Sequence, residues 1–140
     1  MVPVLTRQTI VDRVNCDRLR AHMIEAAEQC ERTALPKLDE PLKLPQLLES
    51  WPAERSLLFA DEMGGEPMAA TPAPAPAAIL VGPEGGFTPE ERQAILALPQ
   101  AKPVSLGPRI LRADTAAVAA ISLWMAGAGD WHRHAPRVAD

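Results

Sequence analysis

Hydrophobic residues occur in three short runs that lack the alternation of a strand with one exposed face. The runs are "RSLLFADE" at 55–62, "AILVG" at 78–82 and "KPVSLG" at 102–107. Continuous apolar runs of this length predict strands that are buried on both faces, as in a parallel sheet. A further short strand is predicted at 2–6, where the sequence is "VPVLT".

Apolar residues at helical spacing predict helices before, between and after these strands, at 15–33, 46–51, 88–98 and 115–129. Asn15 or Asp17 can cap the first of them. The third has a full start signal, because Thr88 is a suitable N-cap, Pro89 takes the first helical position and Glu91 completes a capping box. Strands interleaved with helices predict an α/β fold whose parallel sheet is covered on both faces.

The organisation along the chain predicts one domain over residues 1–130, followed by a loose tail at 131–140. A chain of 140 residues can bury a substantial core. Prolines punctuate the segment 35–45, which is predicted to be extended. The segment 63–78, "MGGEPMAATPAPAPAA", is predicted to be a flexible loop outside the packed core, because glycine, proline and alanine dominate it.

Composition excludes several classes of protein. The net charge of −4 argues against a broad nucleic-acid surface, although a local basic site remains open. Cys16 and Cys30 would lie roughly 21 Å apart along one helix, too far for a disulfide, which predicts reduced thiols in a cytoplasmic protein.

The apolar stretch 116–129 is too short to cross a bilayer. His132 and His134 lack a third ligand at suitable spacing, so no metal site is expected.

The loops that follow the three apolar strands carry the strongest signal for a ligand site. Ligands of parallel sheets bind outside the carboxyl ends of the strands. The loops at 61–65, 82–86 and 107–112 read "DEMGG", "GPEGG" and "GPRILR", and two of them share a Gly-Pro-charged pattern. Gly-Lys-Ser/Thr and Gly-x-Gly-x-x-Gly motifs are absent, and Glu84 would repel a phosphate. The pattern therefore favours a cation, or a ligand bound through backbone groups.

The two Gly-Pro loops and their flanks resemble a known family. The segments "ILVGPEGGFTPEE" at 79–91, "PVSLGPRILRADTA" at 103–116 and "IEAAEQCERTALP" at 24–36 are similar to the bacterial small-subunit ribosomal RNA uracil-N3 methyltransferases of the SPOUT class. The resemblance extends from Pro3 to about Ala126. It implies a SPOUT-type parallel sheet flanked by helices, with a C-terminal deep trefoil knot, in a homodimer whose interface includes residues 115–125.

The resemblance also implies that the three loops bind S-adenosylmethionine and that the chain methylates N3 of a uridine in ribosomal RNA. The implied cofactor-binding residues are Phe59, Ala60, Asp61, Val81, Gly82, Pro83, Glu84, Gly85, Gly86, Ser105, Leu106, Gly107, Ile110 and Leu111. Glu84 would either lie near the cofactor sulfonium or hold its own loop by accepting amide hydrogen bonds.

The reaction requires removal of the uracil imide proton. Arg112 and Arg109 are the cations available in the third loop to stabilise the resulting anion, and Asp114 is the carboxylate available to take the proton. Asp114 is equally suited to cap the last helix.

Two departures from the family pattern leave a second hypothesis open. The family usually has Arg-Thr-Glu-Thr where this chain has Arg-Ala-Asp-Thr at 112–115. The chain is also expected to begin partway into the catalytic domain, without the family's N-terminal RNA-binding domain. The alternative to an active methyltransferase is therefore a non-catalytic knotted module that dimerises or binds RNA.

Overall fold

The computed structural model describes residues 1–10, 13–71 and 73–132. In chain order, the elements are β1 (Val4–Leu5), α1 (Cys16–Gln29), β2 (Leu42–Lys43), α2 (Leu44–Glu49), β3 (Ser56–Ala60), β4 (Glu66–Pro67), the 3-10 turn η1 (Met68–Ala70), β5 (Ala77–Leu80), α3 (Pro89–Leu96), β6 (Ala101–Ser105) and α4 (Ala113–Gly127). The predicted helices and buried strands all occur, with ends that shift by up to four residues. The tail at 133–140, including His134, lies outside the described residues.

Four strands form a parallel sheet in the order β4-β6-β3-β5, as predicted from the apolar runs. Phe59 in β3 pairs with Leu80 on one side and with Pro103 on the other. Strand β3 is therefore central, and its carboxyl end lies beside those of β5 and β6. A separate pair of two-residue strands, β1 and β2, is also parallel, and β2 falls within the segment predicted only to be extended.

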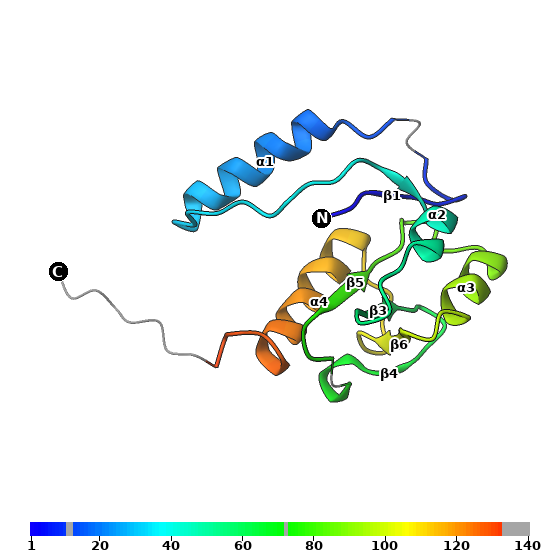
Figure 1. Ribbon diagram of the computed structural model, residues 1–140. Helices are drawn as coiled ribbons and strands as arrows, with labels where there is room; N and C mark the ends of the chain where they lie inside the picture. Colours follow the sequence, from blue (N-terminus) through cyan, green and yellow to red (C-terminus); the bar gives the residue numbers. More distant parts are fainter. Residues whose placement is uncertain (11–12, 72, 133–140) are drawn as a thin grey trace.

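Helices cover both faces of the four-stranded sheet (Figure 1). On one face, the side chains of Leu44, Leu57, Phe59, Leu80 and Ile95 form a core beneath α2 and α3. On the other face, a second core lies beneath α4 and η1 and consists of Leu58, Met68, Ala73, Val104 and Ala120. Successive residues of β3 alternate between the two cores, so this strand is buried on both sides.

The segment 63–78 contributes to the second core, and the prediction that it would not pack is wrong. Met68 and Ala73 are buried against α4, and Glu66 and Pro67 pair with β6. Gly65 also approaches the backbone closely, since a Cβ there would lie 2.5 Å from the Pro103 carbonyl carbon. Tertiary contacts determine the conformation of this segment, and such contacts cannot be inferred from its composition. Its flexibility stays a prediction.

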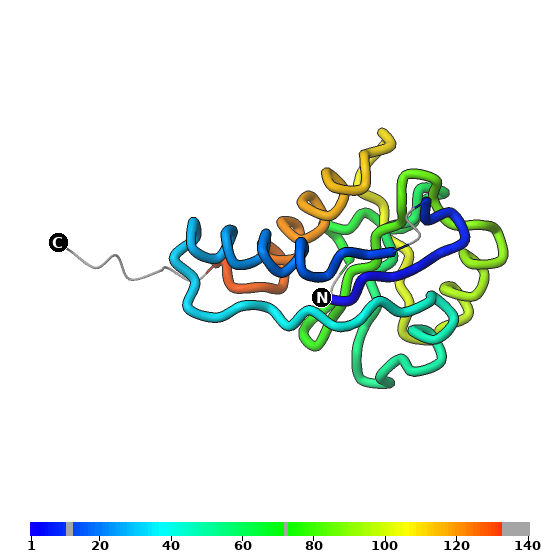
Figure 2. Tube along the Cα trace, turned by 90° about the horizontal axis from the view of Figure 1, so that it is seen from above, coloured from blue at the N-terminus to red at the C-terminus, as the bar shows by residue number. Residues whose placement is uncertain are grey.

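Helix α1 and the chain that leads from it to β2 extend away from the four-stranded sheet (Figures 1 and 2). Asn15, one of the two predicted caps, accepts a hydrogen bond from the Arg18 N–H at 2.9 Å. Ala27 is the buried residue of this helix. Cys16 and Cys30 are both free, as predicted. Within the described ranges, no helix has both the length and the apolarity to cross a membrane.

Candidate functional site

The carboxyl ends of β3, β5 and β6 open into a cavity of about 390 Å³. Three walls enclose it: the turn after β3, the loop between β5 and α3, and the stretch from β6 into α4. Its lining comprises Phe59, Ala60, Asp61, Glu62, Met63, Gly82, Pro83, Glu84, Gly86, Phe87, Pro89, Arg92, Gln93, Val104, Ser105, Leu106, Gly107, Pro108, Arg109, Ile110, Leu111, Ala113 and Ala116. The volume falls within the range of about 300–1,000 Å³ that is usual for small-molecule sites.

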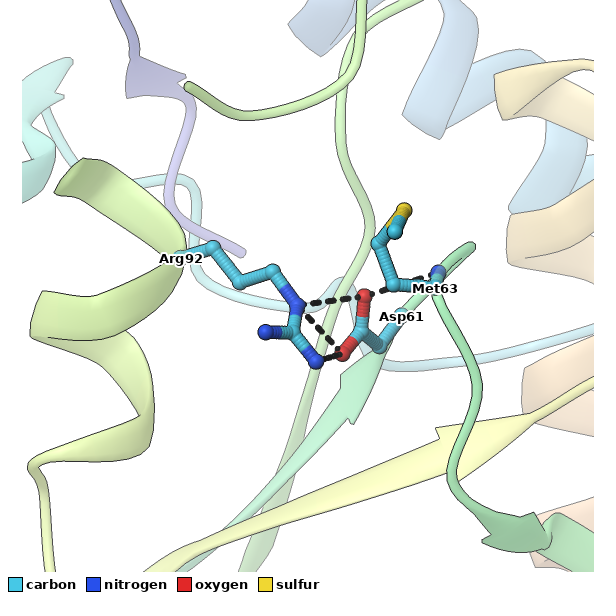
Figure 3. Close-up of polar contacts among 3 residues, drawn as sticks. All are labelled: Asp61, Met63 and Arg92. Atoms are coloured by element: carbon cyan, nitrogen blue, oxygen red, sulfur yellow. Dashed lines mark hydrogen bonds and ion pairs between the residues drawn. The ribbon is translucent and has the colours of Figure 1, made fainter. Parts of the chain in front are cut away.

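The first wall is built around the Asp61 carboxylate, whose side chain is only 2% exposed. Arg92 of α3 pairs with it (Figure 3), through Nη2 to Oδ2 at 2.8 Å and Nε to Oδ2 at 2.9 Å. Hydrogen bonding to Asp61 raises the pKa of Arg92 above its ordinary value. Removing Arg92 would leave the buried Asp61 carboxylate without its ion-pair partner, which is destabilising.

The second wall is the glycine-rich loop at 82–87, which ends at the capped start of α3. The Gly86 N–H donates to the Pro83 carbonyl at 2.8 Å, and Gly86 has a φ of +70° that favours glycine. Gly82 admits the Phe87 ring, which would lie 2.7 Å from a Cβ at that position. Phe87 in turn meets Phe59 edge to face, with 5.3 Å between ring centroids. The loop is thus anchored to the core by its own aromatic side chain.

The start of α3 confirms the predicted capping box. Thr88 Oγ1 accepts the Glu91 N–H at 3.3 Å, and Glu91 Oε2 accepts the Thr88 N–H at 3.0 Å. The other Glu91 oxygen accepts the Arg7 N–H at 2.8 Å, which ties the end of β1 to α3. Glu91 is buried, so these bonds hold the base of the second wall firmly.

The third wall runs from Ser105 to the first turn of α4. Ser105 Oγ accepts the Gly107 N–H at 3.2 Å. Gly107 has a φ of +116°, and a Cβ there would meet nothing within 4 Å, so the absence of a side chain keeps this part of the cavity open. Arg109 and Ile110 are both exposed at this wall.

The predicted cofactor residues mostly come together at this cavity. Twelve of the fourteen line it, and the two that do not are Val81 and Gly85. A Cβ on Gly85 would meet the Gln8 side chain at 2.9 Å, so this glycine accommodates a protein contact. Within the described residues, the Glu84 carboxylate accepts no hydrogen bond, and the hypothesis that it holds its own loop finds no support there.

The three residues predicted to be catalytic are placed differently from one another. Arg109 lines the cavity, whereas Arg112 and Asp114 do not and have side chains 79% and 74% exposed. Asp114 is not the N-cap of α4, because the helix begins at Ala113 and Arg112 is the capping residue. Asp114 therefore does not occupy the N-cap position, although its carboxylate accepts a first-turn N–H of the helix.

The Asp114 carboxylate remains charged at neutral pH. Its Oδ1 accepts the Thr115 N–H at 2.7 Å, and this bond is the largest cause that lowers the pKa of Asp114 below its ordinary value. The Thr115 hydroxyl and the Arg112 guanidinium, 3.9 Å away, act in the same direction. A lowered pKa makes this carboxylate a weaker base than an ordinary aspartate.

Sequence reasoning missed several lining residues. Arg92 and Gln93 lie in the first turns of α3, and their place soon after the second loop is the signal that could have suggested them. Phe87 lies directly before the N-cap residue Thr88. Glu62 and Met63 fall within the first loop but carried no assigned role. No group of three metal-ligating side chains occurs in the part of the chain that the structure describes.

The chain matches known proteins over most of its length. A family model described as "RNA methyltransferase domain" matches residues 1–125. Ribosomal RNA small subunit methyltransferase E of Rickettsia conorii is 34% identical over 127 residues, which cover 87% of this chain and 51% of that protein. The protein of the same name from Synechocystis is 35% identical over 128 residues, with coverage of 86% and 42%.

A solved structure agrees with these matches. Ribosomal RNA small subunit methyltransferase E from Neisseria gonorrhoeae, bound to S-adenosyl methionine, superposes with a TM-score of 0.81 at 29% identity. The match covers 92% of this chain and 55% of that one. This chain thus spans about half the length of the relatives it matches. The family inferred from the paired loop motifs is confirmed, and the chain belongs to the RNA methyltransferase domain family.

Proposed function

We propose that this chain is the catalytic domain of an S-adenosylmethionine-dependent methyltransferase that acts on N3 of a uridine in small-subunit ribosomal RNA. The observation that carries the proposal is the cavity where the two family motifs meet at the carboxyl edge of the sheet. Its relatives are named ribosomal RNA small subunit methyltransferases, and one was solved with the cofactor bound. We further propose that the protein acts in the cytoplasm, where its substrate is assembled.

The lining of the cavity suits S-adenosylmethionine. Phe87 and Leu106, which are partly exposed, offer apolar surface to the adenine ring, and the open main chain at Gly107 allows close approach to the ribose. The exposed Glu84 carboxylate can stabilise the cationic sulfonium or the ammonium group. The bound cofactor would supply the electrophilic methyl group.

The residues of the third wall would then act on the uracil. Loss of the imide proton leaves a negative charge that spreads over the two flanking carbonyl oxygens. Arg109 at the cavity and Arg112 at its rim can stabilise that charge, which makes the imide more acidic. Asp114 is the carboxylate that can accept the proton, and the hydrogen bond from the Thr115 N–H lowers its pKa.

Arg112→Ala is expected to lower the rate of methyl transfer by about 10²–10³-fold, the usual effect of deleting a group that stabilises a developing anion. Cofactor affinity should stay unchanged, because Arg112 does not line the cavity. The measurement is transfer of labelled methyl groups to small-subunit ribosomal RNA, followed by identification of the modified nucleoside. Arg18→Ala, on the exposed side of α1, is the matched control.

Transfer by the wild-type chain to a nucleoside other than uridine would contradict the proposed target. An Arg112→Ala variant with wild-type rates would contradict the role of that residue. A chain that binds the cofactor and RNA but never transfers a methyl group would instead support the non-catalytic alternative. The high exposure of the Arg112 and Asp114 side chains is the observation that favours this alternative.

We also propose a homodimer and a trefoil knot. The knot rests on the family to which the chain belongs, and the sheet order, in which β6 lies between the earlier strands β3 and β4, is compatible with it. Exposed apolar side chains on α4 support the dimer, since Val118 is 67% and Ile121 is 52% exposed. A partner on this face would lie beside the cavity, which Ala116 of the same helix lines.

Val118→Glu is expected to convert the proposed dimer to a monomer, because it places a charge in the centre of the interface. Sedimentation velocity at micromolar concentration measures the change. Ile24→Glu, which adds the same charge at an exposed position of α1, should leave the dimer intact. A wild-type chain that sediments as a monomer at this concentration would contradict the proposal.

A further inference from the structure

The ion pair between Asp61 and Arg92 joins the first wall of the cavity to helix α3, which directly follows the second wall. Asp61 directly follows β3, and Arg92 lies in the first turns of α3. Figure 3 shows the guanidinium of Arg92 facing the Asp61 carboxylate, with Nε also bonded to Oδ1 at 3.2 Å. Both residues line the cavity, and their opposite charges form an ion pair with each other.

The same carboxylate determines the shape of the turn after β3. Asp61 Oδ1 accepts the Met63 N–H at 3.1 Å, and the Asp61 carbonyl accepts the Gly64 N–H at 3.2 Å. The Asp61 N–H donates to the Val104 carbonyl at 3.1 Å, which holds the start of the turn against β6. Rotation of the carboxylate would therefore release Met63 and let this wall move.

Arg92 is well placed to prevent that rotation. Its planar guanidinium contacts both carboxylate oxygens, a geometry that fixes orientation as well as charge. Helix α3, which carries Arg92, begins directly after the second wall and is held by the Thr88–Glu91 capping box. The pair thus links the turn to a rigid base.

A second contact keeps the two walls in register. The Glu62 side chain lies against Gly86, since a Cβ there would come within 2.7 Å of Glu62 Oε1. Asp61 therefore contacts the helix that follows the second wall, and Glu62 contacts the second wall itself.

We infer that Arg92 is a positioning residue of the cofactor site: through Asp61 it holds the turn at 61–64 at a fixed distance from the loop at 82–87, and so keeps the cavity ready for S-adenosylmethionine. This inference rests on the proposed function. A wall that is ordered before binding lowers the entropic cost of binding, which raises affinity. Arg92 acts in this way without needing to touch the ligand.

Isothermal titration of S-adenosylmethionine into the wild-type chain and three variants tests the inference. Arg92→Lys keeps the charge beside Asp61 but loses the two-pronged contact. Arg92→Gln leaves the buried carboxylate unpaired. The double variant Asp61→Asn/Arg92→Gln removes both charges, and the amide oxygen that it introduces can still accept the Met63 N–H. Arg55→Gln is the matched control, because Arg55 lies just before β3 at the opposite end of that strand and does not line the cavity.

The inference predicts that some variants lose cofactor affinity while they keep their thermal stability. Arg92→Gln should lower both the melting temperature and the affinity for the cofactor. The double variant should melt close to the wild-type temperature, because no charge is left unpaired, while its dissociation constant stays about tenfold weaker. Arg92→Lys should also bind about tenfold more weakly with little change in melting temperature.

Wild-type affinity in both the double variant and Arg92→Lys would overturn the inference, because the pair would then serve stability alone. A folded wild-type chain that binds no cofactor would overturn the proposed function itself. The two failures are distinguishable, since the first requires binding by the wild type and the second requires its absence.

Discussion

Phe59→Ala is expected to reduce the free energy of unfolding by about 3–5 kcal/mol, the usual effect of deleting a buried aromatic side chain. Phe59 is 1% exposed and packs with Leu57, Leu80 and Ile95 in the core beneath α2 and α3. Its edge-to-face contact with Phe87 would also be lost. Because small domains are stable by only about 5–15 kcal/mol, this single change removes a large share of the stability.

Urea unfolding followed by circular dichroism measures the loss. Phe59→Leu keeps most of the volume and should lose clearly less. Ile24→Ala, at a side chain 41% exposed on α1, should change the stability by less than about 0.5 kcal/mol. A loss below about 1 kcal/mol for Phe59→Ala would mean that this ring does not fill the core as described.

Gly107→Val is expected to weaken binding of S-adenosylmethionine by more than about 100-fold, because a side chain would enter the space that the ligand needs. Gly107 lines the third wall, and nothing lies within 4 Å of the position that a Cβ would take. Isothermal titration measures the affinity, and a thermal melt checks that the variant is folded.

Valine at this position also strains the backbone, so a second variant is needed. The φ of +116° at Gly107 is unfavourable for a β-branched residue and less so for asparagine. Gly107→Asn should therefore fold with less strain and still lose affinity. Wild-type affinity in Gly107→Asn would show that Gly107 serves the backbone conformation only, and that the ligand does not approach this wall.

The fold class was predictable because its signals are local. The continuous apolar run of β3 reflects burial on both faces, and the structure confirms this with Leu57 and Phe59 in one core and Leu58 in the other. The start of α3 was predictable in detail for the same reason, since Thr88 and Glu91 cap it within one turn.

The segment 63–78 was not predictable because its structure depends on distant partners. Strand β4 consists of two residues that pair with β6, almost forty residues later in the chain. Met68 and Ala73 are buried by α4, which is further away still. A composition rich in proline and glycine indicates the conformational freedom of the segment in the unfolded state. It does not indicate which distant residues the segment contacts in the folded state.

The cavity shows the same division between local and distant information. Glycines 82, 86 and 107 were identifiable as lining residues because they follow apolar strands in a parallel sheet. Arg92 was not, because its role depends on Asp61, which precedes it by 31 residues. The sequence also could not show that Arg109 lines the cavity whereas Arg112 and Asp114 do not.

The central claim is that the three loops at the carboxyl edge of the sheet form an S-adenosylmethionine site. The most direct test is isothermal titration of the cofactor into the purified 140-residue chain, with a thermal melt to establish that it is folded. The account predicts saturable binding at one site per chain, together with a rise in melting temperature as the cofactor concentration increases. A folded chain with no heat of binding and an unchanged melting temperature at millimolar cofactor would contradict it.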